Sequence, residues 1–136
     1  LYIFGGYRLP AEGDAPQEVV AQEVLRYCPT DGQWHTEDGP GSGETAAIVG
    51  ATAMPSGSQH ILILGGTDRE EFTKAVRWEY GDGYLRHTPE WYRFNRHILV
   101  YNTITRAWSQ AGDDEALARA GAAVVATDGG WTIVGC

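Results

Sequence analysis

The 136 residues carry a formal net charge of −8 and include 18 glycines, 5 tryptophans and 2 cysteines. The acidic balance disfavours nucleic acid and anionic membranes as partners, because both bind a basic face. No apolar run reaches the roughly 18 residues of a membrane-spanning helix. Two cysteines are too few for a disulfide framework, and glycine at about twice its usual share of ~7% indicates many tight turns.

The chain opens on an apolar run at residues 1–4 that is followed by Gly5 and Gly6. β-Branched and aromatic residues predict a strand, and the paired glycines predict a turn with open backbone angles. Residues 7–22 are punctuated by proline and glycine and predict an exposed loop. We expect the chain to be a piece of a longer repeat protein, because residues 1–4 already have the composition of a strand interior.

A second strand is predicted at residues 23–28, where Pro29 ends the ladder because it has no N–H. Residues 30–32 have the composition of a hairpin turn, with glycine available for a positive φ. The chain then returns as a short strand at residues 33–36 that carries Trp34.

The same order of features recurs further along. Residues 46–54 are small and apolar and predict a strand buried on both faces, and residues 60–64 form an apolar run that ends in paired glycines. Residues 98–101 predict a third strand, which ends in a tyrosine seven residues before Trp108, the spacing that separates Tyr27 from Trp34. A third copy begins at residues 131–135, after a second small apolar run at residues 121–126.

Residues 67–96 are an insertion that the first copy lacks. Phe72 and Val76 are spaced four apart within a polar stretch, so residues 68–77 predict a short helix that residues 80–84 interrupt. Pro89 suits the first position of another helical turn. Residues 113–119 predict a short acidic connector with one helical turn.

An apolar strand with two glycines, a strand with tyrosine, a turn and a tryptophan together resemble the kelch repeat, a four-stranded blade of an all-β propeller. The insertion, the strand after it and the second small apolar run are similar to the bacterial kelch proteins called cyclically permuted mutarotases, whose characterised relatives are N-acetylneuraminate (sialic acid) epimerases. The motifs that carry this resemblance are Glu90-Trp91-Tyr92-Arg93-Phe94-Asn95-Arg96-His97-Ile98-Leu99-Val100-Tyr101-Asn102 and Arg119-Ala120-Gly121-Ala122-Ala123-Val124-Val125.

The resemblance implies a six-bladed propeller of which this chain holds about two blades and the start of a third. Residues 1–36 would be the last strands of one blade, residues 37–110 a second blade with the helical insertion at 67–96, and residues 111–136 the first strands of a third.

The resemblance also implies an isomerase that interconverts the α and β anomers of a sialic acid without a cofactor, as a monomer in the bacterial periplasm. Its partner would be a small-molecule sugar. The family's proposed acidic and arginine residues directly follow the segment that matches residues 132–136, so we expect the catalytic pair to lie outside these 136 residues. The 136 residues alone are therefore expected to be inactive.

Four residues are candidates for contact with substrate. Arg119 and Glu44 each precede a small apolar strand, where loops of kelch propellers often face the central channel; the alternative is a solvated loop residue. Tyr92 and Asn95, with neighbouring Trp91 and Arg93, suit stacking and hydrogen bonding to a sugar. The alternative for the aromatic residues is that they pin the insertion to the propeller, and Asn95 has the alternative of orienting its loop.

Other residues are assigned to the scaffold. Trp34 and Trp108, with their tyrosine partners, are predicted to pack the blades. The four histidines show no metal-ligand spacing, so no metal site is expected. Two other functions stay open: a non-catalytic kelch module that binds protein or glycan through its loops, and a relative that acts on another sugar.

Overall fold

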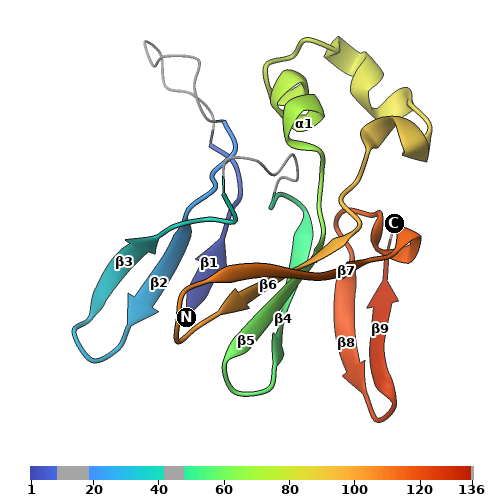
Figure 1. Ribbon diagram of the computed structural model, residues 1–136. Coiled ribbons are helices and arrows are strands. Elements are labelled where there is room, and N and C mark those ends of the chain that lie inside the picture. The colour runs from blue at the N-terminus through green and yellow to red at the C-terminus, as the bar shows by residue number, and fades with distance from the viewer. Residues whose placement is uncertain (9–18, 42–47, 136) are drawn as a thin grey trace.

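The computed structural model describes residues 1–8, 19–41 and 48–135 as three separate antiparallel sheets (Figure 1). The first sheet has strands β1 (Tyr2–Phe4), β2 (Val24–Cys28) and β3 (Gln33–Glu37). The second has β4 (Ala51–Ser56), β5 (His60–Gly65), β6 (His97–Asn102) and β7 (Trp108–Asp113). The third has β8 (Ala123–Thr127) and β9 (Gly130–Val134).

The strands occupy matching places in successive sheets, as the repeat predicts. Strand β5 pairs with β4 as β9 pairs with β8, and the tyrosine and tryptophan of each complete copy are direct cross-strand partners, Tyr27 with Trp34 and Tyr101 with Trp108. The four-stranded sheet is one blade of a β-propeller and the other two sheets are parts of its neighbours, which confirms the predicted all-β fold class.

The paired glycines of each sheet contact the backbone of the loop that enters the next sheet. Gly5 has φ +59° and Gly65 has φ +69°, a region that favours glycine. A Cβ on Gly5 would lie 2.5 Å from the carbonyl oxygen of Ile48, and one on Gly65 would lie 2.4 Å from that of Arg119. The N–H of the following glycine donates to the same oxygen, at 2.9 Å in both copies. The backbone of Ile48 therefore occupies the place that Arg119 occupies one blade later.

Apolar and aromatic side chains fill the space between the first two sheets. Ile63 and Tyr101 are fully buried, and Phe4 packs edge-on against Tyr101 and Trp108, with ring centroids 5.4 and 5.8 Å apart. The indole N–H of Trp108 also donates to the carbonyl oxygen of Asp38 at 2.9 Å. Trp108 thus packs between blades as predicted.

Trp34 differs from Trp108 in its surroundings. It lies against Tyr27 of its own sheet, with centroids 5.4 Å apart, and is 50% exposed. The prediction that Trp34 packs one blade on another is not met within the described residues. Strand β4 also departs from expectation: burial on both faces is predicted, but Met54 is its one buried residue.

A buried carboxylate links the first two sheets. The Glu37 side chain is 6% exposed and accepts a hydrogen bond from Arg26 Nε at 2.6 Å and another from the hydroxyl of Tyr101. Arg106 Nε lies 3.3 Å from the same carboxylate. Burial raises the pKa of Glu37, but the Tyr101 hydroxyl and the two guanidinium groups outweigh it, so the pKa lies below its ordinary value.

The insertion between β5 and β6 is helical and lies at the end of the sheets away from the β4–β5 and β8–β9 turns (Figure 1). It contains α1 (Arg69–Val76), η1 (Gly81–Arg86) and η2 (Pro89–Tyr92), and a further helical turn, η3 (Glu115–Leu117), follows β7. The predicted helix, the turn at Pro89 and the acidic connector are confirmed. The predicted interruption at residues 80–84 is instead largely the 3₁₀ helix η1. No helix in the described part of the chain has both the length and the apolar character needed to cross a membrane.

Candidate functional site

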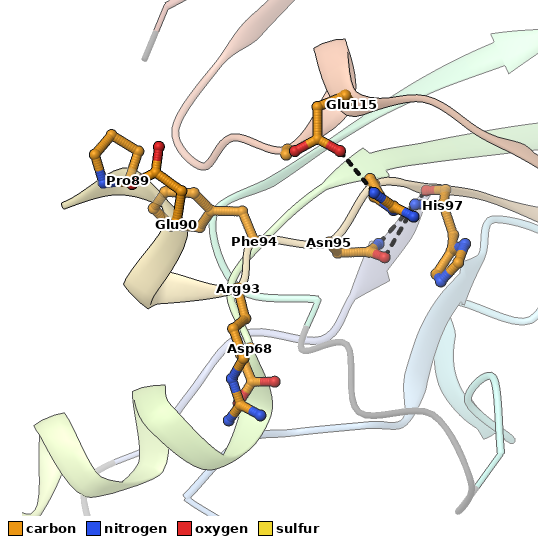
Figure 2. A pocket seen from close by; sticks show the side chains of 10 residues that line it. Asp68, Pro89, Glu90, Arg93, Phe94, Asn95, His97 and Glu115 are labelled. Atoms are coloured by element: carbon orange, nitrogen blue, oxygen red, sulfur yellow. Dashed lines mark hydrogen bonds and ion pairs between the residues drawn. The ribbon is translucent and has the colours of Figure 1, made fainter.

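A pocket of about 430 Å³ opens between the insertion and the connector that follows β7 (Figure 2). One wall is the end of the insertion, another is the connector around η3, and the start of α1 closes a third side. The lining residues are Asp68, Pro89, Glu90, Arg93, Phe94, Asn95, Arg96, His97, Glu115 and Ala118.

Asp68 and Arg93 form the wall next to α1. Asp68 is the N-cap of the helix: its Oδ1 accepts from the backbone N–H of Glu71 at 3.0 Å. The same Oδ1 lies 3.2 Å from Arg93 Nη2, and Glu71 Oε1 lies 2.9 Å from that nitrogen. Arg93 adopts the left-handed conformation at φ +49°, directly after η2. This ion pair holds the C-terminal end of the insertion against the N-terminus of α1.

Arg96 and Glu115 form the opposite wall. Arg96 Nη1 donates to Glu115 Oε2 at 2.6 Å, and Arg96 Nε lies 3.4 Å from Asp113 Oδ2. These carboxylates raise the pKa of Arg96. The charge of Arg96 is therefore largely neutralised within the pocket, while its planar donors stay half exposed.

Asn95 lies at the base of the pocket and is 6% exposed. Its Nδ2 donates to the carbonyl oxygen of Gly65 at 3.1 Å, its Oδ1 accepts from the N–H of His97 at 3.1 Å, and its backbone N–H donates to Gly66 at 2.9 Å. The two ends of the insertion are thus tied together at one point. The amide of Asn95 is used to orient the loop, the structural role weighed against sugar contact.

Tyr92 does not line the pocket. Its hydroxyl donates to the carbonyl oxygen of Tyr84 at 2.6 Å, and its ring stacks on Phe94 with centroids 5.2 Å apart. It belongs to the aromatic cluster of the insertion, in which His87 and Trp91 stack at 3.7 Å. These ring contacts lie within the insertion and hold it together, which differs from the predicted alternative that the aromatic residues pin the insertion to the propeller. The cluster comprises Tyr80, Tyr84, His87, Trp91, Tyr92 and Phe94.

Arg119 follows the pocket residue Ala118 but does not itself line the pocket, and its side chain joins the connector around η3 to the residue after β9. Its Nε donates to the carbonyl oxygen of Ala116 and its Nη1 to that of Gly135, each at 2.8 Å. Both partners are neutral, and within residues 1–8, 19–41 and 48–135 no carboxylate lies within ion-pair distance of Arg119. The charge of Arg119 is therefore less compensated than the charges of the pocket residues Arg93 and Arg96, which pair with carboxylates. Glu44, the fourth candidate, lies outside the described residues.

Sequence reasoning missed Asp68, Arg96, His97 and Glu115 as pocket residues. Their ion pairs join positions 19 and 25 residues apart, and no local pattern signals such a partner. Nor do the pocket carboxylates and His97 gather into a metal site: in the described part of the chain, the group that brings three ligand atoms within 4.8 Å of one another is Cys28, Asp31 and His35, and it lies in the β2–β3 hairpin.

Comparison with known proteins gives a consistent result. The model of the N-acetylneuraminate epimerase family matches residues 1–136. The N-acetylneuraminate epimerases of Vibrio cholerae and Yersinia enterocolitica are each 24% identical, over 92% and 98% of this chain and 35% and 36% of their own lengths. The solved structure of YjhT superposes with a TM-score of 0.72 at 24% identity, over 93% of this chain and 38% of that one.

The chain spans about a third of the length of the curated relatives that it matches. The likeness to YjhT supports the propeller fold, and the family match extends across every residue given. The chain belongs to the N-acetylneuraminate epimerase family.

Proposed function

We propose that the protein containing this chain interconverts the α and β anomers of N-acetylneuraminate, in the bacterial periplasm. The observation that carries the proposal is the family match over residues 1–136, which includes the whole insertion. The reaction requires a base to take the anomeric hydroxyl proton and an acid to protonate the ring oxygen, and it needs no cofactor.

Arg119 is the best candidate in this chain for the anchor of the sugar carboxylate. A guanidinium offers two parallel donors to a carboxylate, and this pairing is strongest where no other carboxylate competes. The contacts of Arg119 are carbonyl oxygens of Ala116 and Gly135, so its charge remains available to a substrate anion. Arg93 and Arg96 are already paired with acidic residues and suit hydroxyl recognition better.

The pocket has the size and character of a sugar site. Its volume of about 430 Å³ falls within the roughly 300–1,000 Å³ common for small-molecule sites. Glu90 lies in the wall, and hydrogen bonds from its own backbone N–H and from Thr88 lower its pKa, so it is a carboxylate at neutral pH. Such a group accepts hydrogen bonds from sugar hydroxyls.

The test is NMR exchange spectroscopy of N-acetylneuraminate with the full-length protein. We expect anomer exchange faster than in buffer of equal pH, and a rate equal to that of buffer would refute the isomerase. The isolated 136 residues are expected to match buffer, because they represent about a third of a relative's length.

Variants of Arg119 test the anchor separately from the activity. Arg119→Met should lower the exchange rate at limiting sugar by about 10–100-fold, which corresponds to a charge-assisted hydrogen bond of about 1.5–3 kcal/mol. Arg8→Met is the control, because Arg8 is an exposed arginine that pairs with Glu23 and does not line the pocket. An active protein with an unaffected Arg119→Met rate would leave the isomerase standing and remove the anchor.

A binding module without catalysis is the second candidate, and a specific observation favours it. Trp78 and Leu85 of the insertion are 70% and 84% exposed. Contiguous exposed apolar patches mark sites of contact with other macromolecules, and a partner that covers the insertion would bury both side chains. Retention of a glycan or protein partner by a full-length protein with no effect on anomer exchange would favour this function.

A further inference from the structure

The β2–β3 hairpin holds three potential metal ligands at the end of the first sheet away from α1 (Figure 1). The sulfur of Cys28, a carboxylate oxygen of Asp31 and a ring nitrogen of His35 all lie within 4.8 Å of one another. His35 Nε2 is 2.8 Å from Asp31 Oδ2. None of the three lines the pocket described above.

The strand register explains why these side chains meet. Cys28 pairs with Gln33 and Arg26 pairs with His35 across the hairpin. Cross-strand partners share a face and residues two apart share a face, so Cys28 and His35 are diagonal neighbours on one side of the sheet. Asp31 lies in the turn between them. Cys28 is partly buried, while the Asp31 and His35 side chains are 46% and 40% exposed, which leaves the group open to an ion from solvent.

The second blade contains the same hairpin without these ligands. Its turn has the same length, and Arg106 at φ +62° stands where the first hairpin has Gly32 at φ +70°. The N–H of each donates to the matching strand residue, Gly32 to Cys28 at 2.9 Å and Arg106 to Asn102 at 2.8 Å. The residues that correspond to Cys28, Asp31 and His35 are therefore Asn102, Thr105 and Ser109.

This comparison separates what the turn needs from what it does not need. Asp31 Oδ1 accepts from the N–H of Gln33 at 2.8 Å, and Thr105 Oγ1 accepts from the N–H of Ala107 at 3.4 Å in the same place. A hydroxyl thus serves the turn as a carboxylate does. The second oxygen of Asp31, the thiol and the imidazole are additions that the hairpin does not require in order to form.

We propose that the β2–β3 hairpin binds a divalent transition-metal ion of the zinc class through Cys28 Sγ, Asp31 Oδ2 and His35 Nε2. Thiolate, imidazole and carboxylate are the three ligand types of zinc sites, and a three-ligand set leaves a fourth tetrahedral position for water or another donor. Binding displaces the thiol proton and replaces the hydrogen bond between His35 and Asp31 with two metal–ligand bonds. The nearby cation Arg26 is compensated by Glu37 at 2.6 Å.

Cobalt(II) titration of the protein tests the site, because a thiolate ligand gives a charge-transfer band in the near ultraviolet. We expect one equivalent of Co²⁺ to produce the band and an equivalent of Zn²⁺ to abolish it. The matched variant carries Cys28→Asn, Asp31→Thr and His35→Ser, the residues that the second blade uses in the same turn. It should fold with an unchanged circular dichroism spectrum and lose the band.

Single variants keep the test decisive if the triple variant does not fold. His35→Gln should weaken Co²⁺ binding by more than the ~10–100-fold that the loss of an outer partner of a metal ligand causes. Cys136→Ser should leave the band in place. The proposal is overturned if wild-type protein gives no band, if His35→Gln binds Co²⁺ as wild type does, or if the band depends on Cys136.

Discussion

Gly65 shows how one residue can set the spacing between two blades. Its φ of +69° excludes most side chains, and the carbonyl oxygen of Arg119 fills the space that a Cβ would take. Gly57 has a similar φ of +64° in the β4–β5 turn, but no atom lies within 4 Å of its would-be Cβ. A comparison of Gly57 with Gly65 therefore separates the cost of backbone strain from the cost of the steric contact.

Gly65→Ala is expected to destabilise the protein more than Gly57→Ala. The backbone conformation alone should cost about 1–2 kcal/mol at either position, and the contact with Arg119 should add about 1–3 kcal/mol at Gly65. Urea unfolding of both variants measures the difference. Equal urea midpoints for the two variants would show that the loop before β8 moves to accommodate the added Cβ at no measurable cost in stability.

Tyr101 and Glu37 form a polar contact across the interface between the first two sheets. Tyr101→Phe removes one donor from a buried carboxylate and should lower the free energy of unfolding by about 1.5–3 kcal/mol. Tyr27→Phe, at the matching place of the first sheet, is the control and should have a smaller effect. A Tyr101→Phe midpoint equal to that of the control would contradict the assignment.

The same carboxylate predicts a pH dependence of stability. The pKa of Glu37 is lower in the folded protein than its ordinary value of 4.5, so its contribution is complete above pH 4.5. That contribution is lost as the pH falls through the folded-state pKa. Glu37→Gln should therefore lose less stability than wild type between neutral and strongly acidic pH in urea unfolding series. Parallel curves for the two proteins would argue against it.

At the scale of elements, the insertion has an aromatic core of its own. Trp91 stacks on His87 and contacts Tyr80 at a centroid distance of 5.1 Å, whereas Trp78 is 70% exposed. Trp91→Ala should remove hydrogen-exchange protection from η1 and η2 while the four-stranded sheet keeps its own. Trp78→Ala, the control, should leave both unchanged. Loss of protection throughout the sheet would show that the insertion does not unfold independently.

Elements with local signals could be predicted from sequence, and contacts between elements could not. Apolar runs, paired glycines and the equal tyrosine–tryptophan spacing indicate the strands and their repetition, and Asp68 begins the predicted helix. The pocket depends on pairs such as Arg96 with Glu115, and the interface depends on Glu37 with Tyr101, which are 64 residues apart. Only the register of the folded sheets brings such residues together. Burial of β4 was overestimated for a related reason, since composition does not show which face a neighbour covers.

At the scale of the whole molecule, contact between blades depends on a few aromatic rings. Phe4 of the first sheet packs on Tyr101 and Trp108 of the second, while Ile3 is 46% exposed on the other face of β1. Phe4→Ala should reduce the free energy of unfolding by about 3 kcal/mol, the low end for this substitution because Phe4 is partly buried, and change the near-ultraviolet circular dichroism of the interface. Ile3→Ala should do neither. An unchanged spectrum in Phe4→Ala would indicate that the two sheets hold together without this ring.

The hydrogen bonds from Asn95 to Gly65 and Gly66 have a consequence for how the sequence of the insertion can change. The backbone leaves the sheet after Gly66 and returns by bonding to that same residue at 2.9 Å. An excursion closed at its root transmits little strain to the strands beneath it, and each doubling of its length adds only about 0.6 kcal/mol of closure entropy. Residues can therefore be inserted between Gly66 and Asn95, and a new specificity acquired there, while the strands of the blade keep their structure.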